Sequence, residues 1–161
     1  MSENRKIVDL TLDERTVVRR SPQVEHERKV AIFDLLEDNR FAPKAEDGAD
    51  LEGPFHLLLG IVENRLVFDV RNEDGHELTT FTLPLSPFRS IVRDYFLVCD
   101  SYYKAIKTAL PSKIEAIDMG RRGLHDEGAE LLRERLAGKA DVDEDTARRL
   151  FTLICVLHIR S

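Results

Sequence analysis

The sequence predicts an α+β fold, in which an antiparallel sheet of about four strands carries helices packed on one side. Two kinds of pattern support this class. Apolar and polar residues alternate in residues 6–14 and again within residues 55–85, as in strands with one buried face. Longer stretches after each of these regions repeat apolar residues at helical spacing. The expected order is therefore strand, helix, three strands and three helices, in a single domain covering residues 1–161.

Composition limits the class of function. The chain has 161 residues, a net charge of −6 and 42% hydrophobic residues, which is an ordinary balance for a soluble protein. Its acidic field argues against general binding to nucleic acid or anionic membranes, because both favour basic surfaces. No stretch resembles a leader or a membrane span, so we expect a cytoplasmic protein without nucleic-acid or membrane partners. Cys99 and Cys155 lie in apolar settings without metal-binding spacing, which predicts two buried, reduced thiols.

The first expected strand and the first helix are separated by a basic segment. One side of the strand at residues 6–14 is formed by Val8, Leu10 and Leu12. Residues 15–20 are expected to form a connection. Ser21 and Pro22 then supply a helix N-cap and a first-turn proline, and the apolar stripe beyond them ends near Asn39.

Residues 42–54 are expected to form a polar loop. They contain one lysine, four acidic residues, two prolines and two glycines, and they are longer than most connections within a domain. Two interpretations stay open. The loop is either a lid or partner-binding segment, or a solvated insertion.

Residues 55–85 predict a three-stranded meander. Tight turns are expected at residues 63–64 and 72–75, and the second contains Gly75, which suits a left-handed backbone conformation. Turns this short leave no room for the crossover that parallel strands need, so neighbouring strands should run antiparallel. We expect the strand at residues 6–14 to join this sheet.

Ser86 and Pro87 repeat the helix-start signal, and the helix that follows has one apolar face. That face is formed by Phe88, Ile91, Val92, Tyr95, Val98, Cys99, Tyr102 and Ile106. Arg89 and Arg93 fall outside it. The apolar face is expected to pack against the meander or the next helix.

Residues 111–138 form the longest helical pattern, and Ser112 with Glu115 matches a capping box at its start. Read as one helix, this stretch places Arg121 and His125 near the middle of the apolar face. Charged groups at such positions are costly unless they are paired or functional.

A second interpretation removes this conflict. Gly120 and Gly123 flank the two arginines, and glycine inside a helix costs about 1 kcal/mol relative to alanine. The helix would then stop at these glycines and restart near Leu124, so the sequence leaves a continuous and a broken helix open.

The last helix is expected at residues 143–158, with Asp143 as its cap. From residue 150 onward it is apolar almost all round. Such a helix is buried centrally, or its end meets another subunit, which would make a homo-oligomer. A terminal strand is the competing interpretation for residues 153–159.

No familiar catalytic signature is present: the sequence lacks a phosphate-binding glycine loop, a metalloprotease helix, a nucleophile elbow and a cysteine-pair zinc pattern. The five histidines are scattered singly, so we expect no metal and no cofactor. The candidate ligand-binding residues are Arg121, Arg122, His125, Glu127, Arg89 and Arg93.

Two interpretations of this cluster stay open. In the first, the arginines hold a carboxylate or phosphate in bidentate fashion, and His125 donates or relays a proton. In the second, the cluster is a local ion-pair lattice, because Arg122 lies four residues from both Asp118 and Asp126.

The order of elements and the segments VCDSYYKAI, RRGLHDEGAELL and LICVLHIR resemble an uncharacterised family of short alphaproteobacterial proteins. The resemblance covers essentially the whole chain. It implies a bacterial, cytoplasmic setting, but no activity, ligand or functional residue.

Two classes of function therefore remain. The first is a non-enzymatic binding or regulatory module with a protein partner, supported by the missing catalytic motifs and the apolar C-terminal segment. The second is an enzyme or sensor for a small anionic metabolite that uses the Arg121 cluster. A concave site with Arg121 and His125 facing inward would favour the second class, and a flat apolar face would favour the first.

Overall fold

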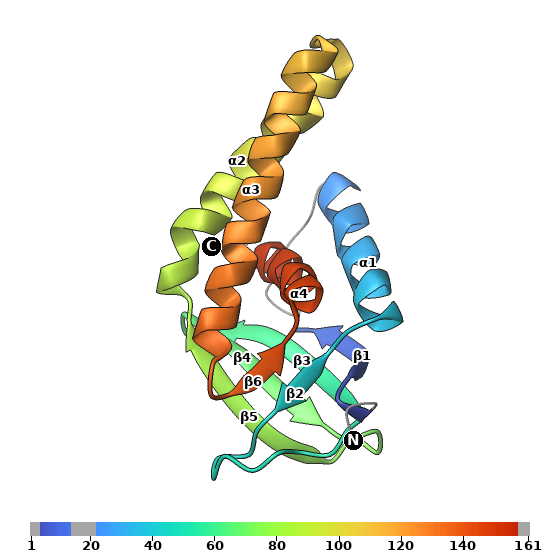
Figure 1. Ribbon diagram of the computed structural model, residues 1–161, viewed down its shortest axis with the longest axis vertical. Coiled ribbons are helices and arrows are strands. Elements are labelled where there is room, and N and C mark those ends of the chain that lie inside the picture. The colour runs from blue at the N-terminus through green and yellow to red at the C-terminus, as the bar shows by residue number, and fades with distance from the viewer. Residues whose placement is uncertain (1–3, 14–21, 158–161) are drawn as a thin grey trace.

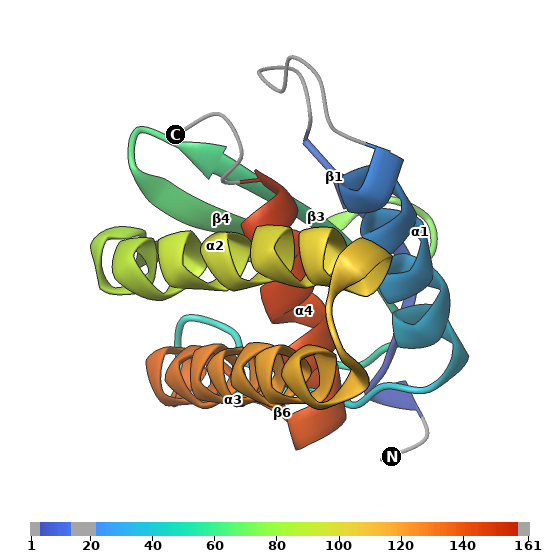
Figure 2. The same ribbon diagram turned by 90° about the horizontal axis from the view of Figure 1, so that it is seen from above.

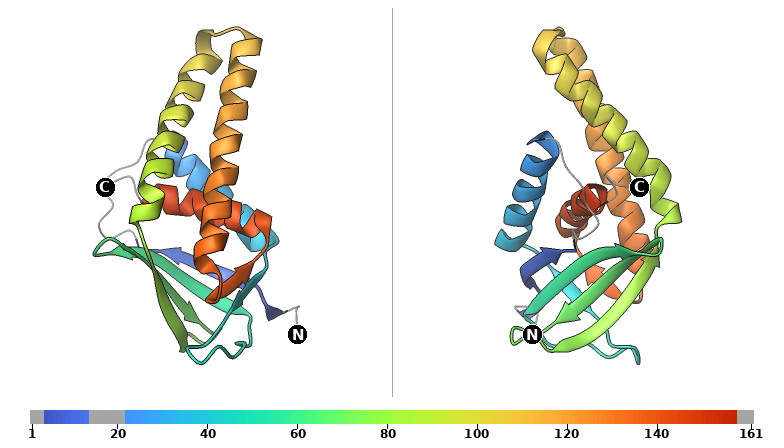
Figure 3. Two further views of the ribbon diagram at one scale, coloured as in Figure 1. Left: turned by 60° about the vertical axis from the view of Figure 1, so that its left-hand side comes forward. Right: turned by 180° about the vertical axis from the view of Figure 1, so that it is seen from behind.

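The computed structural model describes residues 4–13 and 22–157, and it confirms the α+β class (Figure 1). Four strands form one sheet in the order β1–β3–β4–β5. They are β1 (Ile7–Leu12), β3 (Phe55–Val62), β4 (Arg65–Arg71) and β5 (Glu77–Pro84). The helices of the described region are α1 (Pro22–Glu37), α2 (Ser86–Thr108), α3 (Pro111–Leu136) and α4 (Glu144–Leu157). The helices lie on one side of this sheet, as both views of Figure 3 show.

Some expectations concern residues outside the described region. The basic connection at residues 15–20, the Ser21 cap, and His158 with the residue after it all belong there.

The predicted meander is confirmed. β3 pairs antiparallel with β4, and β4 pairs antiparallel with β5. Glu63 and Asn64 have φ angles of 50° and 63°, the left-handed pair that a two-residue hairpin turn requires. The second turn uses Gly75 at a φ of 86°. Alternate residues of β4 are fully buried, namely Leu66, Phe68 and Val70.

The sheet is mixed and not wholly antiparallel, because β1 joins the edge of β3 in parallel orientation. Helix α1 supplies the crossover that parallel neighbours need. The pairing register shifts between Ile7 and Asp9. As a result Ile7 is fully buried and Val8 is 36% exposed, so the expectation that Val8 shares the face of Leu10 is wrong.

A second, two-stranded sheet was missed by the sequence patterns. β2 (Phe41–Pro43) pairs antiparallel with β6 (Ala140–Val142), with buried Phe41 opposite buried Val142. Three residues are too few to show an alternation that stands out. β2 occupies the start of the expected polar loop. The loop then bridges back on itself, with Lys44 Nζ 2.7 Å from Asp50 Oδ1.

Helices α2 and α3 form a long antiparallel hairpin whose far end projects beyond α1 and α4 (Figure 1). The projection explains why Ile106, predicted on the apolar face, is 49% exposed. α3 is continuous through Gly120 and Gly123, so the broken-helix interpretation is wrong. It begins after Leu110 with Pro111 in its first turn and no side-chain cap, so the predicted capping box does not form.

α4 is the centre of the core. Asp143 caps it, since its Oδ1 accepts a hydrogen bond from the Thr146 amide at 2.9 Å. Residues 150–157 are all buried, so the apolar run is accounted for within its own chain, and the competing strand is wrong as far as Leu157. α3 approaches α4 closely at Gly128, where an added Cβ would overlap the Phe151 ring.

Both cysteines are buried, unpaired thiols, as predicted. Burial raises the pKa of the Cys99 thiol to about 11. It also raises the pKa of the Cys155 thiol well above its ordinary value. Both side chains therefore act as packing groups.

Candidate functional site

The continuous helix α3 turns Arg121 and His125 toward α1 and α4, one helical turn apart. Neither lies in the deep core. The Arg121 side chain is 25% exposed, and both residues line a pocket between α1 and the other three helices. Figure 1 shows α1 facing the hairpin across α4. The conflict in the sequence is thus resolved by an open pocket rather than by a helix break.

Arg121 is held from two sides. Its Nε and Nη2 both donate to Asp118 Oδ1, with Nε at 3.2 Å. Its guanidinium carbon lies 4.4 Å from the centroid of the Tyr102 ring, a distance at which a cation is attracted to the ring face. These contacts fix the guanidinium plane before any ligand arrives.

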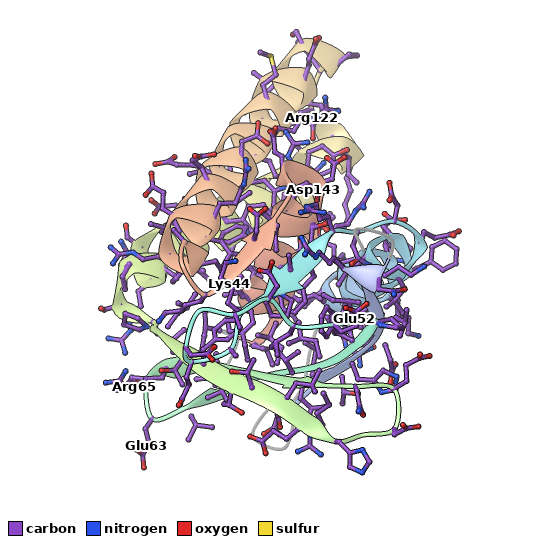
Figure 4. The ribbon with its side chains drawn as sticks, turned by 60° about the horizontal axis from the view of Figure 1, so that its bottom comes forward. Lys44, Glu52, Glu63, Arg65, Arg122 and Asp143 are labelled. Carbon is purple, nitrogen blue, oxygen red and sulfur yellow. The ribbon has the colours of Figure 1, made fainter. Side chains whose placement is uncertain are left out.

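Asp118 is shared by two arginines, because Arg122 Nη2 lies 2.9 Å from its other oxygen, Oδ2. The hydrogen bond from Arg121 is the main cause that lowers the pKa of the Asp118 carboxyl. Arg122 is 76% exposed and lies on the projecting part of the hairpin (Figure 4). Two guanidinium groups on one carboxylate leave this end of the site with net positive charge.

His125 packs as a partly buried ring with a hydrogen bond at Nε2. Its Nε2 is 2.7 Å from Thr152 Oγ1, and Thr152 donates its own hydroxyl hydrogen to the Arg148 carbonyl at 3.2 Å. Thr152 therefore accepts from His125, which assigns the hydrogen to Nε2. The ring also stacks on Tyr95, with centroids 5.6 Å apart. Burial lowers the pKa of His125 below its ordinary value of 6.5 and favours the neutral ring.

The ion-pair lattice required Asp126 to pair with Arg122, but Asp126 pairs with another arginine. It accepts from Arg148 Nε at 2.8 Å, across the α3–α4 contact. Arg148 also lies 3.2 Å from Glu144 and 3.5 Å from Asp145. Three carboxylates therefore hold Arg148 in place, and Asp145 among them lines the pocket.

The pocket has a volume of about 460 Å³, within the range of small-molecule sites. Its charged lining consists of three arginines and three carboxylates, namely Arg121, Arg148, Arg149, Glu27, Asp34 and Asp145. Tyr95 and Tyr103 add aromatic surface. The Tyr103 hydroxyl donates to Glu27 at 2.7 Å, and burial followed by this bond raises the pKa of Tyr103.

The other candidate residues lie elsewhere. Glu127 borders a groove on the opposite side of the α2–α3 hairpin. Arg89 donates to Asn64 Oδ1 at 2.9 Å, at the β3–β4 turn. Arg93 is 69% exposed beside Asp94. Of the six candidates, the structure brings only Arg121 and His125 together in the pocket, with Arg122 behind Asp118.

Most of the pocket lining was missed because it comes from α1 and α4. The sequence does hold a usable signal in α4, where Arg148, Arg149 and Thr152 share one side of an otherwise apolar helix. Glu27 and Asp34 of α1 show no such contrast, since α1 is polar over most of its surface.

Comparison with known proteins places this chain in a family. The family model described as "Uncharacterised protein family (UPF0262)" matches residues 4–160. The chain belongs to the UPF0262 family. A UPF0262 protein of Bradyrhizobium sp. (strain ORS 278) is 63% identical over 153 residues, which cover 95% of this chain and 89% of the relative. The resemblance to an uncharacterised alphaproteobacterial family is thereby confirmed.

Two further UPF0262 relatives are similarly close. One from Bradyrhizobium diazoefficiens is 61% identical over 155 residues, covering 96% of this chain and 92% of its own. One from Rhodospirillum rubrum is 60% identical over 154 residues, covering 96% and 92%. No solved structure matches this UPF0262 chain.

The described residues form neither a metal-binding cluster nor a helix that could span a membrane. No group of three or more His, Cys, Asp or Glu side chains in the described ranges is arranged to hold a metal ion. None of the helices described here is long and apolar enough to cross a membrane.

Proposed function

We propose that this UPF0262 protein is a cytoplasmic, non-enzymatic binding module for a small ligand with an anionic group. The ligand occupies the pocket between α1 and the helices α2, α3 and α4. The observation that carries the proposal is the preorganised guanidinium of Arg121, fixed by Asp118 and Tyr102 at the edge of a concave site.

Arg121 has donors left for a ligand. Its bonds to Asp118 use Nε and Nη2, and no bond from Nη1 to any described residue is found. The second guanidinium on Asp118, from Arg122, keeps the local charge positive. A carboxylate or phosphate oxygen bound at Nη1 forms a charge-assisted hydrogen bond, which is stronger than a neutral one.

The remainder of the pocket suits the donor groups of the same ligand. Glu27, Asp34 and Asp145 line it, and Arg148 is already surrounded by carboxylates. A compact ligand with an anionic group at Arg121 and an amine or hydroxyl group facing Glu27 satisfies both ends. A rigid, fixed lining reduces the entropy that binding must overcome.

The surroundings of His125 favour binding over catalysis. Its Nε2 hydrogen is committed to Thr152 and the ring is stacked on Tyr95. A general acid must instead present its exchangeable proton to the substrate. In this proposal His125 shapes the pocket floor and holds α3 against α4.

The test is thermal melting of the wild type with inorganic phosphate, succinate, glutamate and a panel of phosphorylated metabolites. A ligand at 100 times its dissociation constant stabilises the folded state by about 2.7 kcal/mol, which is a readily measured shift. Arg121→Met should abolish the shift and Arg133→Ala, an exposed position on the same helix, should keep it. If no compound shifts the wild type, or if Arg121→Met responds like the wild type, the proposal is wrong.

A further inference from the structure

The α2–α3 hairpin has a second face, opposite the pocket, which we call the outer face. On α2 it is formed by Ser90, Asp94, Leu97, Ser101 and Lys104. On α3 it is formed by Lys113, Ala116, Gly120, Gly123, Glu127, Glu130 and Glu134. Within each helix the neighbours on this face are three or four residues apart, so they follow one another along a single side.

No described helix or strand covers the outer face. Figure 2 looks onto the hairpin with α4 behind it and nothing in front. Every residue of the outer face is exposed, and Leu97 is 62% exposed. Near the base of the hairpin the face is hollowed into a groove of about 420 Å³ between the two helices, floored by Ile91, Leu124 and Leu131.

Charge is ordered along this face. Four carboxylates border the groove at the base, namely Asp94, Glu127, Glu130 and Glu134. Lys104 and Lys113 lie toward the tip. Within the described residues no ion pair of Glu127, Glu130 or Glu134 is found. Lys104 does pair with Asp100 at 2.9 Å, but this pair is more than 60% exposed at both ends and such pairs are weak.

Between the two charged ends the face is made of small residues. Gly120 and Gly123 each cost helix stability relative to alanine. Packing within the chain does not require either glycine. A Cβ added at Gly120 would meet Val98 at an ordinary 3.9 Å, and one at Gly123 would meet nothing within 4 Å. Small residues let two helix backbones approach closely, which gives these glycines a use only if another chain lies against them.

We propose that the outer face binds a second copy of this chain, with the two hairpins packed antiparallel about a two-fold axis. In that arrangement the basic tip of each copy meets the acidic base of the other. Each contact occurs twice, because a two-fold interface is built from the same patch on both subunits. This dimer goes beyond the proposed ligand function and leaves the pocket open in both copies.

The residue spacing on α3 fits one two-fold centre. Lys113 precedes Gly120 by seven residues, and Glu130 follows Gly123 by seven. An antiparallel α3 pair centred between the glycines therefore places Gly120 against Gly123 and Lys113 against Glu130. Seven residues span about 10 Å of helix, so the two ion pairs lie at equal distances on either side of the glycine contact.

The spacing on α2 leads independently to the same centre. Asp94 and Lys104 lie symmetrically about the midpoint of Leu97 and Ser101. That midpoint lies within one helical turn of the α3 centre, because Val98 packs beside Gly120 in the antiparallel hairpin. One two-fold axis therefore places Asp94 of one copy against Lys104 of the other, and Leu97 against Ser101. The same axis places Gly120 against Gly123 and Lys113 against Glu130.

Charge reversal in two complementary variants tests the dimer. The acidic variant carries Lys104→Glu and Lys113→Glu, and the basic variant carries Asp94→Lys and Glu130→Lys. Each should dimerise at least about a hundredfold more weakly than the wild type at low salt, because like charges then face each other across the interface. Mixed together, the two variants should form a heterodimer by sedimentation equilibrium or native mass spectrometry.

The control carries Lys6→Glu and Lys29→Glu, at exposed positions away from the hairpin. Its net charge changes by the same amount as that of the acidic variant. It should dimerise like the wild type, and circular dichroism should show all variants folded, since every changed position is exposed. A monomeric wild type at high concentration and low salt overturns the proposal. So does a dimer that survives in both variants, or a failure of the folded variants to associate when mixed.

Discussion

The two faces of the α2–α3 hairpin come from the same two helices but organise charge in opposite ways. On the inner face, which borders the pocket, Arg121 of α3 lies against Asp118 of the same helix, and Arg148 of α4 lies against Asp126 of α3. On the outer face acids and bases are sorted to opposite ends of the hairpin. Charges that are paired within one chain fix side chains around a concave site. Charges that are separated along a surface can instead be paired by the opposite charges of another molecule.

Glycine is used differently on the two faces as well, and this contrast predicts the largest effect. Gly128→Ala should lower the free energy of unfolding by about 1–3 kcal/mol, because the new methyl group overlaps the Phe151 ring in a packed core. Gly123→Ala should raise it by up to about 1 kcal/mol, because the site is open and alanine favours helix. Urea unfolding of dilute protein measures both. Equal effects of the two substitutions would break the comparison.

Arg121 and Arg122 share one carboxylate but differ in exposure, so they form a matched pair. Arg121→Met should lower the free energy of unfolding by about 1–3 kcal/mol, because it removes two hydrogen bonds from a partly buried Asp118 and the contact with Tyr102. Arg122→Met should change it by at most about 0.5 kcal/mol, since its side chain is 76% exposed. Denaturant titration measures the difference, and a larger loss at Arg122 would contradict this account.

The smallest expected effect concerns pH. Burial lowers the pKa of His125 in the folded state, so below its ordinary value of 6.5 the unfolded chain binds a proton that the folded chain does not. Stability from this residue is therefore full above pH 6.5 and falls as pH drops toward the lowered folded pKa. Arg121, Arg148 and Asp126 are the charges that act on the ring, and Asp118 titrates only at much lower pH.

His125→Gln tests this expectation, because the amide can still donate to Thr152 but does not titrate. Its melting temperature should fall less than that of the wild type between neutral and mildly acidic pH. His76→Gln, in the exposed β4–β5 turn, should leave the wild-type slope unchanged. If the melting temperatures of His125→Gln and the wild type fall equally with pH, the burial of His125 does not contribute to the pH dependence of stability.

Local patterns were sufficient to predict most of the fold. Alternation and turn chemistry identified the meander, including the turn at Glu63 and Asn64, and helical periodicity with a cap at Asp143 identified α4. The parallel pairing of β1 was missed, because it depends on how α1 crosses the sheet and not on β1 itself. Strands β2 and β6 were missed because each is stabilised only by its distant partner.

The candidate site was predicted in part for the same reason. Arg121 and His125 stood out because a charged residue on an apolar helix face is a local contradiction. Glu27, Asp34 and Tyr103 lie on polar or ordinary surfaces of their own helices, and only tertiary packing brings them to the pocket. Conversely, Arg89 and Arg93 were included because the preceding helix was expected to pack alongside, and α2 does so but turns them away from the pocket.

Amide NMR on one isotope-labelled sample tests the central claim most directly, namely that the two hairpin faces serve different molecules. Addition of inorganic phosphate, or of a stronger ligand from the melting screen, should shift the amides of Arg121, His125 and Thr152. Dilution should instead shift those of Leu97, Ser101 and Lys113. If ligand and dilution perturb the same residues, or if neither perturbs its own set, the division of the hairpin into a ligand face and a dimer face is wrong.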